Sequence, residues 1–225
     1  TLLEIPQGKC FSQLRSLLLF GVDDPMSESS MHLLIYDGLS MLKVLHLRST
    51  SLERFPGNVV KLFHLRYLSL RGTQVKVLPN SIGLLWILET LDLKNAYMKE
   101  LPVDILRLQK LRHLLLYRNE IGHIYLPFHH KHGFEAPSKI RGLQSLQKLC
   151  FIEANHVNSS SIVKKIGRLT QLRRLGILKL RKEDGVGVCS SIEKLSNLRS
   201  LDVTSIEEDE IFDLQSLSPA PQFLQ

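Results

Sequence analysis

The segment HHKH, His129 to His132, holds three imidazoles, and imidazole is the commonest side-chain ligand of transition metals. No cysteine, carboxylate or helical i, i+4 spacing accompanies it, so the sequence favours a solvated polar loop over a metal site. The glycines of DGVGV, Asp184 to Val188, indicate a turn, because the rest of a nucleotide-binding motif is missing. Neither segment predicts a reaction.

The arrangements of residues that enzymes use are also missing from the sequence. It contains no G-x-x-x-x-G-K-[ST] phosphate loop, no G-x-S-x-G nucleophile elbow and no H-E-x-x-H zinc motif. Cys10, Cys150 and Cys189 are odd in number and far apart, which argues against a disulfide framework or a zinc site and favours a reducing, intracellular setting. We therefore expect no catalytic residue, no metal, no cofactor and no enzymatic activity in this segment.

The charge of the chain points to recognition instead of catalysis. A net charge of +7 suits a nucleic-acid binder, a partner of acidic proteins or a solvated basic surface. No stretch approaches the roughly 20 apolar residues that span a bilayer, so we expect a soluble protein without a membrane span.

The elements that would position these charges come from a repeated phrase, L-x-x-L-x-L. It begins at eight leucines: Leu14, Leu42, Leu65, Leu88, Leu111, Leu146, Leu172 and Leu198. Successive phrases begin 23 residues apart between Leu42 and Leu111, and 26 residues apart between Leu146 and Leu198. Periods of about 20 to 29 residues with this phrase are typical of leucine-rich repeats. The sequence thus predicts an α/β solenoid, or horseshoe, with a parallel sheet on its concave face.

The convex side should be made of loops or 3₁₀ turns in the early repeats and short helices in the later ones. Proline follows an apolar residue at Pro56, Pro79, Pro102 and, less regularly, Pro127, and proline ends strand pairing. In the later repeats the segments that follow the strands have apolar residues at helical spacing. Ser190 to Glu193 fits a capping box that would begin a helix.

We expect residues 1–225 to be a single leucine-rich-repeat segment of about eight repeats, truncated at both ends. Leu224 stands 26 residues after Leu198, where a ninth strand would begin. Two irregular inserts, near 21–38 and 121–138, interrupt the period and should form loops.

Alternation along each strand predicts which side chains a partner would touch. The outward positions are Val44, His46, Arg48, Tyr67, Ser69, Arg71, Thr90, Asp92, Lys94, His113, Leu115, Tyr117, Lys148, Cys150 and Ile152. Arginine and tyrosine dominate interface hot spots. The candidate protein-interaction face is therefore Arg48, Arg66, Tyr67, Arg71, Arg112, Tyr117 and Arg118. These residues could equally form a solvated edge of the repeats that binds no partner. Nucleic acid is a disfavoured partner, because carboxylates such as Asp92 lie on the same face and would repel phosphates.

The stretch LRYLSLRGTQVKVLPNSIGLLWILETLDL, Leu65 to Leu93, resembles the repeats of plant intracellular nucleotide-binding leucine-rich-repeat (NLR) disease resistance proteins. In that family a Thr precedes the L-P turn, as Thr50 and Thr73 do here. Later blocks such as IGRLTQLRRLGILKLRKEDG, Ile166 to Gly185, look like those of cereal coiled-coil-type members. The chain departs from the pattern at Ala96 and Asn119, so we expect a less regular stack after about Leu116.

The resemblance implies a sensor in plant defence. Such repeats hold the receptor's nucleotide-binding module shut and recognise a pathogen effector directly or through a guarded host protein. The resemblance implies ADP or ATP only in that absent module, and a location in the cytoplasm, in the nucleus or at the periphery of the plasma membrane. The alternatives are an intracellular leucine-rich scaffold or ubiquitin-ligase substrate adaptor, and an extracellular receptor ectodomain, which would carry paired cysteines and many sequons.

Overall fold

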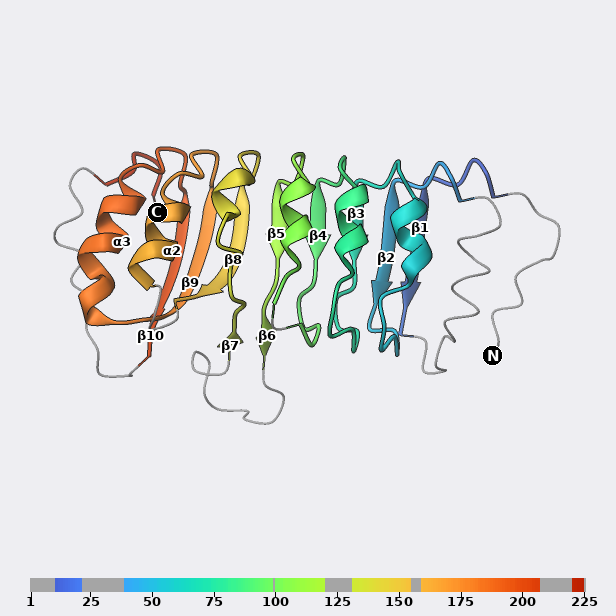
Figure 1. Ribbon diagram of the computed structural model, residues 1–225, viewed down its shortest axis with the longest axis horizontal. Coiled ribbons are helices and arrows are strands. Elements are labelled where there is room, and N and C mark those ends of the chain that lie inside the picture. Colours follow the sequence, from blue (N-terminus) through green and yellow to red (C-terminus); the bar gives the residue numbers. More distant parts are fainter. Residues whose placement is uncertain are drawn as a thin grey trace.

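The computed structural model describes residues 11–21, 39–98, 100–119, 131–154, 159–206 and 220–224. These residues form a sheet of eight parallel strands that lie side by side in chain order (Figure 1). The strands are β1 (Ser16–Phe20), β2 (Val44–Arg48), β3 (Tyr67–Ser69), β4 (Thr90–Asp92), β5 (His113–Leu115), β8 (Lys148–Glu153), β9 (Arg174–Leu180) and β10 (Ser200–Ser205). Each of the eight predicted phrases thus forms one strand, and the predicted leucine-rich-repeat solenoid is confirmed.

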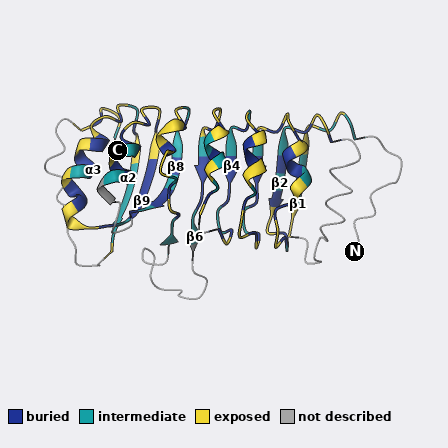
Figure 2. Ribbon diagram, in the orientation of Figure 1, coloured by how far each residue is buried: buried dark blue, intermediate teal, exposed yellow. Residues whose placement is uncertain are grey.

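The core is a stack of leucines from equivalent positions. Leu42, Leu45 and Leu47 are 0% exposed, and in register Leu45 is paired with Leu68 of the next strand, which is equally buried. Burying one such side chain contributes about 1.5–3 kcal/mol, but only when a neighbouring repeat covers it. Figure 2 shows buried residues along the strands and on the helical turns.

The helical turns cover one face of the sheet, which leaves the concave face open (Figure 1). Early repeats use 3₁₀ turns and later ones α-helices, as the sequence predicts; the three extra residues of the 26-residue period leave length for a two-turn helix. The turns are η1 (Gly57–Lys61), η2 (Asn80–Leu84), η3 (Val103–Arg107), η4 (Ile140–Gly142) and η5 (Lys182–Asp184), and the helices are α2 (Ser159–Ile166) and α3 (Gly185–Ile192). Pro56, Pro79 and Pro102 directly precede η1, η2 and η3.

A residue with left-handed backbone geometry follows each early strand. Gly21, Ser49, Gly72 and Asn95 have φ values of 51° to 70°, and each donates its N–H to the following repeat over 2.7–3.2 Å. Gly and Asn adopt this geometry readily. In the next repeat Arg118 stands at this position and continues instead into a strand, β6 (Arg118–Asn119). The regular stack therefore changes here, near the point where the sequence predicted a departure.

The second insert returns to the sheet and fills a fork between β5 and β8. Those strands pair over only two residues, and β6 pairs antiparallel with β7 (Lys131–His132). Beyond β7, Phe134 lies 1% exposed in the core, with its N–H donated to the Phe151 carbonyl at 3.2 Å. The regular spacing resumes at Pro137, whose carbonyl accepts the Ile140 N–H as the earlier prolines do for their turns. Pro127 and residues 120–130 lie outside the described residues.

Three local predictions were wrong. Ile152 is 0% exposed instead of outward, because Phe151 takes a φ of 43° and shifts the strand register after Leu149. DGVGV begins α3 instead of a turn, so Ser190 lies within that helix and begins none. The polar contact just before α3 comes instead from Asp184, whose carboxylate accepts the Arg181 N–H at 3.1 Å.

The last described segment repeats the turn that introduces every strand. Leu224 donates its N–H to the Pro221 carbonyl at 3.0 Å, as Leu198 does to Leu195, and its side chain packs against the core. Leu224 thus takes the first position of a repeat, at the residue where the period predicts one. Residues 22–38 of the first insert lie outside the described residues.

Candidate protein-interaction face

A row of rings crosses the concave face at its β1 end. The Phe20 ring centre lies 5.0 Å from that of His46, and the His46 centre lies 5.9 Å from that of Tyr67 at an angle of only 28°. Phe20 is 55% exposed although it ends a strand. Three adjacent strands therefore present a continuous aromatic surface, of the kind that contributes most to protein interfaces. We call these three residues the aromatic row.

Two arginines, Arg48 and Arg71, lie beside the aromatic row. Arg48 ends β2 and Arg71 follows β3 at the equivalent position. Within the described residues neither forms an ion pair with a carboxylate. The nearby Asp92 is 5% exposed, and its Oδ1 accepts the Lys94 backbone N–H at 3.1 Å. Both guanidinium groups can thus receive carboxylates from a partner.

Burial sets the protonation of the aromatic row. It lowers the pKa of His46 below its ordinary value of 6.5; the charges of Arg48 and Arg71 lower the pKa as well, while Asp92 opposes them. The imidazole is therefore neutral near pH 7. Burial, followed by the Asp92 charge, raises the pKa of Tyr67 above its ordinary value, so its phenol stays protonated. Near neutral pH the row is uncharged, and the positive charge comes from its arginine neighbours.

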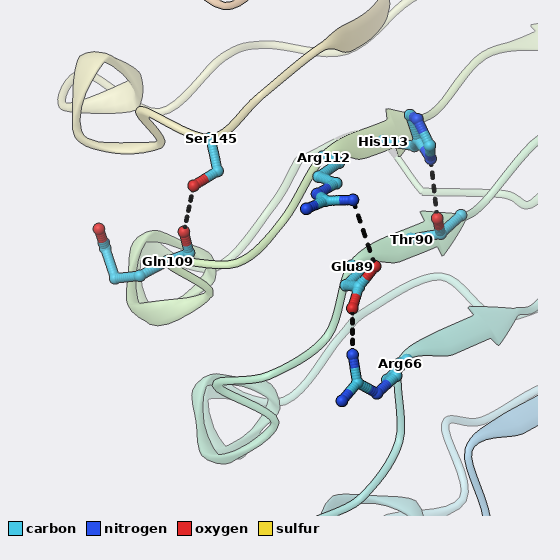
Figure 3. Close-up of polar contacts among 7 residues, drawn as sticks. All are labelled: Arg66, Glu89, Thr90, Gln109, Arg112, His113 and Ser145. Atoms are coloured by element: carbon cyan, nitrogen blue, oxygen red, sulfur yellow. Dashed lines mark hydrogen bonds and ion pairs between the residues drawn. The ribbon is translucent and has the colours of Figure 1, made fainter.

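A second line of charges runs along the rim where the strands begin. This rim ladder consists of the second residue of each phrase: Arg15, Lys43, Arg66, Glu89, Arg112, Gln147, Arg173 and Arg199. Backbone N–H groups of each repeat bond to the ladder carbonyl of the repeat before it, which aligns the side chains. Glu89 bridges its neighbours, at 2.6 Å from Arg66 and 3.8 Å from Arg112 (Figure 3). Both arginine side chains are more than half exposed, so each pair contributes only about 0–1 kcal/mol.

The middle of the concave face offers no reactive nucleophile among the described residues. His113 Nδ1 lies 2.9 Å from Thr90 Oγ1 (Figure 3), and burial, followed by Lys148 and Arg112, lowers its pKa. Burial raises the pKa of the Cys150 thiol despite three cations around it. A protonated thiol is a poor nucleophile. These residues can form contacts, but nothing in their arrangement activates them for catalysis.

The remaining predicted residues lie at the fork. Tyr117 meets the Phe151 ring edge-on at 5.2 Å, and the Arg118 guanidinium lies 5.4 Å from the centre of the Tyr97 ring. Lys131 covers the other ring at the fork, with its Nζ 4.5 Å from the Phe151 centre. These contacts stabilise the fork by cation–π and ring packing.

Of the seven predicted residues, Arg66 and Arg112 lie on the rim, and Arg48, Tyr67 and Arg71 lie on the concave face. Tyr117 stands at the position equivalent to Arg48 and Arg71, where the sheet meets the fork, and Arg118 follows it in β6. The prediction omitted Phe20, although the apolar run that ends the first phrase was a visible signal for it.

Metal and membrane sites were sought over the described ranges. No group of three or more His, Cys, Asp or Glu residues there could hold a metal ion. His132 lies in β7, whereas His129 and His130 fall outside the described residues. None of the helices described is long and apolar enough to cross a membrane.

The repeat pattern and the sheet agree with a known family. A family model described as "Leucine-rich repeat region" matches residues 10–225. The chain belongs to this leucine-rich-repeat family. Comparison with functionally curated proteins gave no match. Leucine-rich-repeat regions are protein-interaction scaffolds, and their solenoid typically has no enzymatic role.

Solved structures share the fold of this leucine-rich-repeat chain. The leucine-rich-repeat protein LIC12759 of Leptospira interrogans superposes with a TM-score of 0.59 at 24% identity, over 85% of this chain and 49% of its own length. Internalin inlF of Listeria monocytogenes gives 0.58 at 16% identity, over 92% and 60%. The plant peptide hormone receptor RGFR1, in complex with RGF2, gives 0.53 at 20% identity, over 86% and 32%. The chain therefore spans half or less of the Leptospira protein and the plant receptor.

Proposed function

We propose that this leucine-rich-repeat region is the sensing domain of a plant intracellular NLR immune receptor. In this role it holds the nucleotide-binding module of the same receptor shut and recognises a pathogen effector directly or through a guarded host protein. The surface that supports the proposal is the aromatic row with Arg48 and Arg71. The exposed Phe20 ring and two guanidinium groups that have no carboxylate partner among the described residues suit an acidic protein surface. ADP or ATP would belong to the nucleotide-binding module, and the receptor would act in the cytoplasm.

The residues that carry the family resemblance have a structural role in the repeat. Thr50 Oγ1 donates to the Leu47 carbonyl at 3.1 Å, and Thr73 Oγ1 donates to Leu70 at 2.7 Å. Both hydroxyls are buried and close the turn after the strand. They support the assignment to this form of repeat, and they say nothing about which partner binds.

Charge reversal in the full receptor tests the closure. We expect the double variant Arg48→Glu, Arg71→Glu to signal without a pathogen, because it would repel the acidic surface that keeps the receptor shut. Cell death in transiently transformed leaves measures this activity. Arg168→Glu, at an exposed position after α2, is the matched charge control and should stay silent. If the double variant accumulates normally and stays silent, Arg48 and Arg71 do not help to hold the receptor shut.

The preceding sequence tests the receptor class independently. A G-x-x-x-x-G-K-[ST] phosphate loop encoded upstream of Thr1 in the transcript would support the immune switch. A ligase-binding segment there, without such a loop, would favour the ubiquitin-ligase adaptor, and a signal peptide would favour the ectodomain.

A further inference from the structure

Two large aromatic side chains are exposed on the rim of the solenoid, away from the concave face. Phe63 is 56% exposed and Trp86 is 58% exposed. Each stands two residues before the leucine that opens its repeat, in the turn that leads into the strand. Because backbone bonds hold adjacent repeats in register, equivalent positions recur about every 4.8 Å. The two positions are therefore neighbours on one edge.

The other repeats show that the fold does not require aromatic residues there. Every other copy has a polar residue at the equivalent position: Ser12, Ser40, Gln109, Gln144, Thr170, Ser196 and Gln222. Gln109 uses its side chain to satisfy the turn, since its Nε2 donates to the Leu106 carbonyl at 2.6 Å. Gln144 makes the same bond to Arg141. Phe63 and Trp86 cannot make it, so these two repeats give up a hydrogen bond and expose an apolar ring.

The neighbouring position extends the apolar surface. From the fifth to the eighth phrase the residue just before the opening leucine is polar, and Ser145 there donates to the Gln109 carbonyl at 2.8 Å (Figure 3). Asn197 does the same for Thr170 at 3.0 Å. The repeats on either side of Phe63 have an apolar residue there instead, Met41 at 41% exposed and Ile87 half-buried, whereas the Phe63 repeat itself has the exposed His64. We call Met41, Phe63, Trp86 and Ile87 the rim patch.

The charges beside the rim patch are mainly positive. Lys43 of the rim ladder is two residues after Met41 and Arg66 is three residues after Phe63, and the Arg66 side chain is 57% exposed. Glu89 is the only carboxylate in the ladder, and Arg66 and Arg112 already share it. A partner here would thus meet an apolar surface bordered by cations, which favours carboxylates around an apolar anchor.

We propose that the rim patch, with Lys43 and Arg66, is a second docking site that binds an acidic protein segment carrying large apolar side chains. Its partner is distinct from that of the concave face, and the site does not depend on the receptor role. Met41 and Ile87 give no flat surface on which bases could stack, so the patch fits the apolar side chains of a peptide better than single-stranded nucleic acid. A second copy of the chain would present the same cations and be repelled.

The experiment selects binders from a displayed random-peptide library against the chain. Selection against the double variant Phe63→Gln, Trp86→Gln removes peptides that bind elsewhere. Glutamine already fills this position at Gln109, Gln144 and Gln222, and the first two make the turn bond, so the variant should fold and can regain that bond. We expect the surviving peptides to combine Asp or Glu with Leu, Phe or Trp.

Trp86 is the single tryptophan of the chain, so its fluorescence reports binding at the site itself. A selected peptide synthesised without Trp should shift the emission to shorter wavelength and protect it from acrylamide quenching. Phe63→Gln should weaken binding by roughly tenfold or more, and Arg66→Glu should abolish the preference for acidic peptides. Gln109→Ala, the equivalent position one repeat on, should have no effect. Binding should also survive Arg48→Glu with Arg71→Glu, which separates this site from the concave face.

Four outcomes would overturn the proposal. They are selected peptides without acidic enrichment, a selection that yields no binder dependent on Phe63 and Trp86, tighter binding of an oligo(dT) strand than of the peptides, and a blue shift on concentrating the chain alone. The third would indicate a nucleic-acid site and the fourth a contact between copies.

Discussion

Phe134 should behave as a core residue of the solenoid even though it comes from an irregular insert. Its side chain is 1% exposed, and it is among the largest fully buried side chains of the described core. Replacing a buried Phe with Ala removes its transfer free energy and leaves a cavity, at a cost of about 3–5 kcal/mol. For a domain of this size, 1 kcal/mol lowers the melting temperature by about 2–4 °C. Phe134→Ala should therefore lower it by roughly 6–20 °C.

Urea unfolding followed by circular dichroism measures the change in the free energy of unfolding. The matched control is Glu135→Ala, because this neighbouring side chain is exposed and should change stability by no more than about 0.5 kcal/mol. The slope with urea should stay the same if the repeats unfold together, and a shallower slope would show that the two sides of the fork separate.

The reasoning fails if Phe134→Ala falls within about 1 kcal/mol of Glu135→Ala, a difference too small for a lost buried ring. The insert would then be a loop lying on the stack, as the sequence predicted, and the fork would be held by backbone pairing alone.

Three further predictions test other contacts. A Cβ on Gly133 would lie 2.2 Å from the Phe151 carbonyl oxygen, so Gly133→Ala should cost at least about 1–3 kcal/mol; an unchanged urea midpoint would contradict the close approach. Glu89→Gln removes both rim ion pairs and should cost no more than about 1 kcal/mol at low salt and less at high salt; a loss that ignores salt would be inconsistent with exposed pairs. The pKa values of His46 and His113 lie below the ordinary 6.5, so the folded chain binds these protons more weakly than the unfolded chain. Stability should hold above pH 6.5 and fall as the pH drops from there through the lowered pKa values, and the double variant His46→Gln, His113→Gln should flatten this fall; an unaltered pH profile would show that other groups cause it.

The repeat could be predicted because its leucines recur at fixed intervals and each has only one place to be buried. Leu45, Leu68 and Leu91 are all 0% exposed, and this depends on period alone. The bulge at Phe151 could not be predicted, since nothing in a Phe signals a left-handed φ. The sequence did not indicate the role of Phe134 either. The carbonyl that accepts its N–H belongs to Phe151, which lies in a later repeat.

The candidate face stays a prediction, and its contacts were less visible in the sequence than the fold was. Residue type and alternation identified Arg48, Tyr67 and Arg71, but they could not show that Glu89 engages Arg66 and Arg112. That contact depends on the exact stagger of adjacent repeats. The rim patch, by contrast, left a signal in the sequence, because aligning the repeats exposes two aromatic residues in an otherwise polar column.

The backbone bonds of the rim ladder have a consequence for how the gene can change. Lys43, Arg66 and Glu89 join their neighbours through the same backbone groups, so recombination that duplicated or deleted residues 65–87 would leave an unbroken sheet. Phe134 and Phe151 bond across two different units and must be inherited together. We therefore expect relatives of this chain to gain and lose repeats on the N-terminal side of the fork, while residues 111–154 pass between generations as one block.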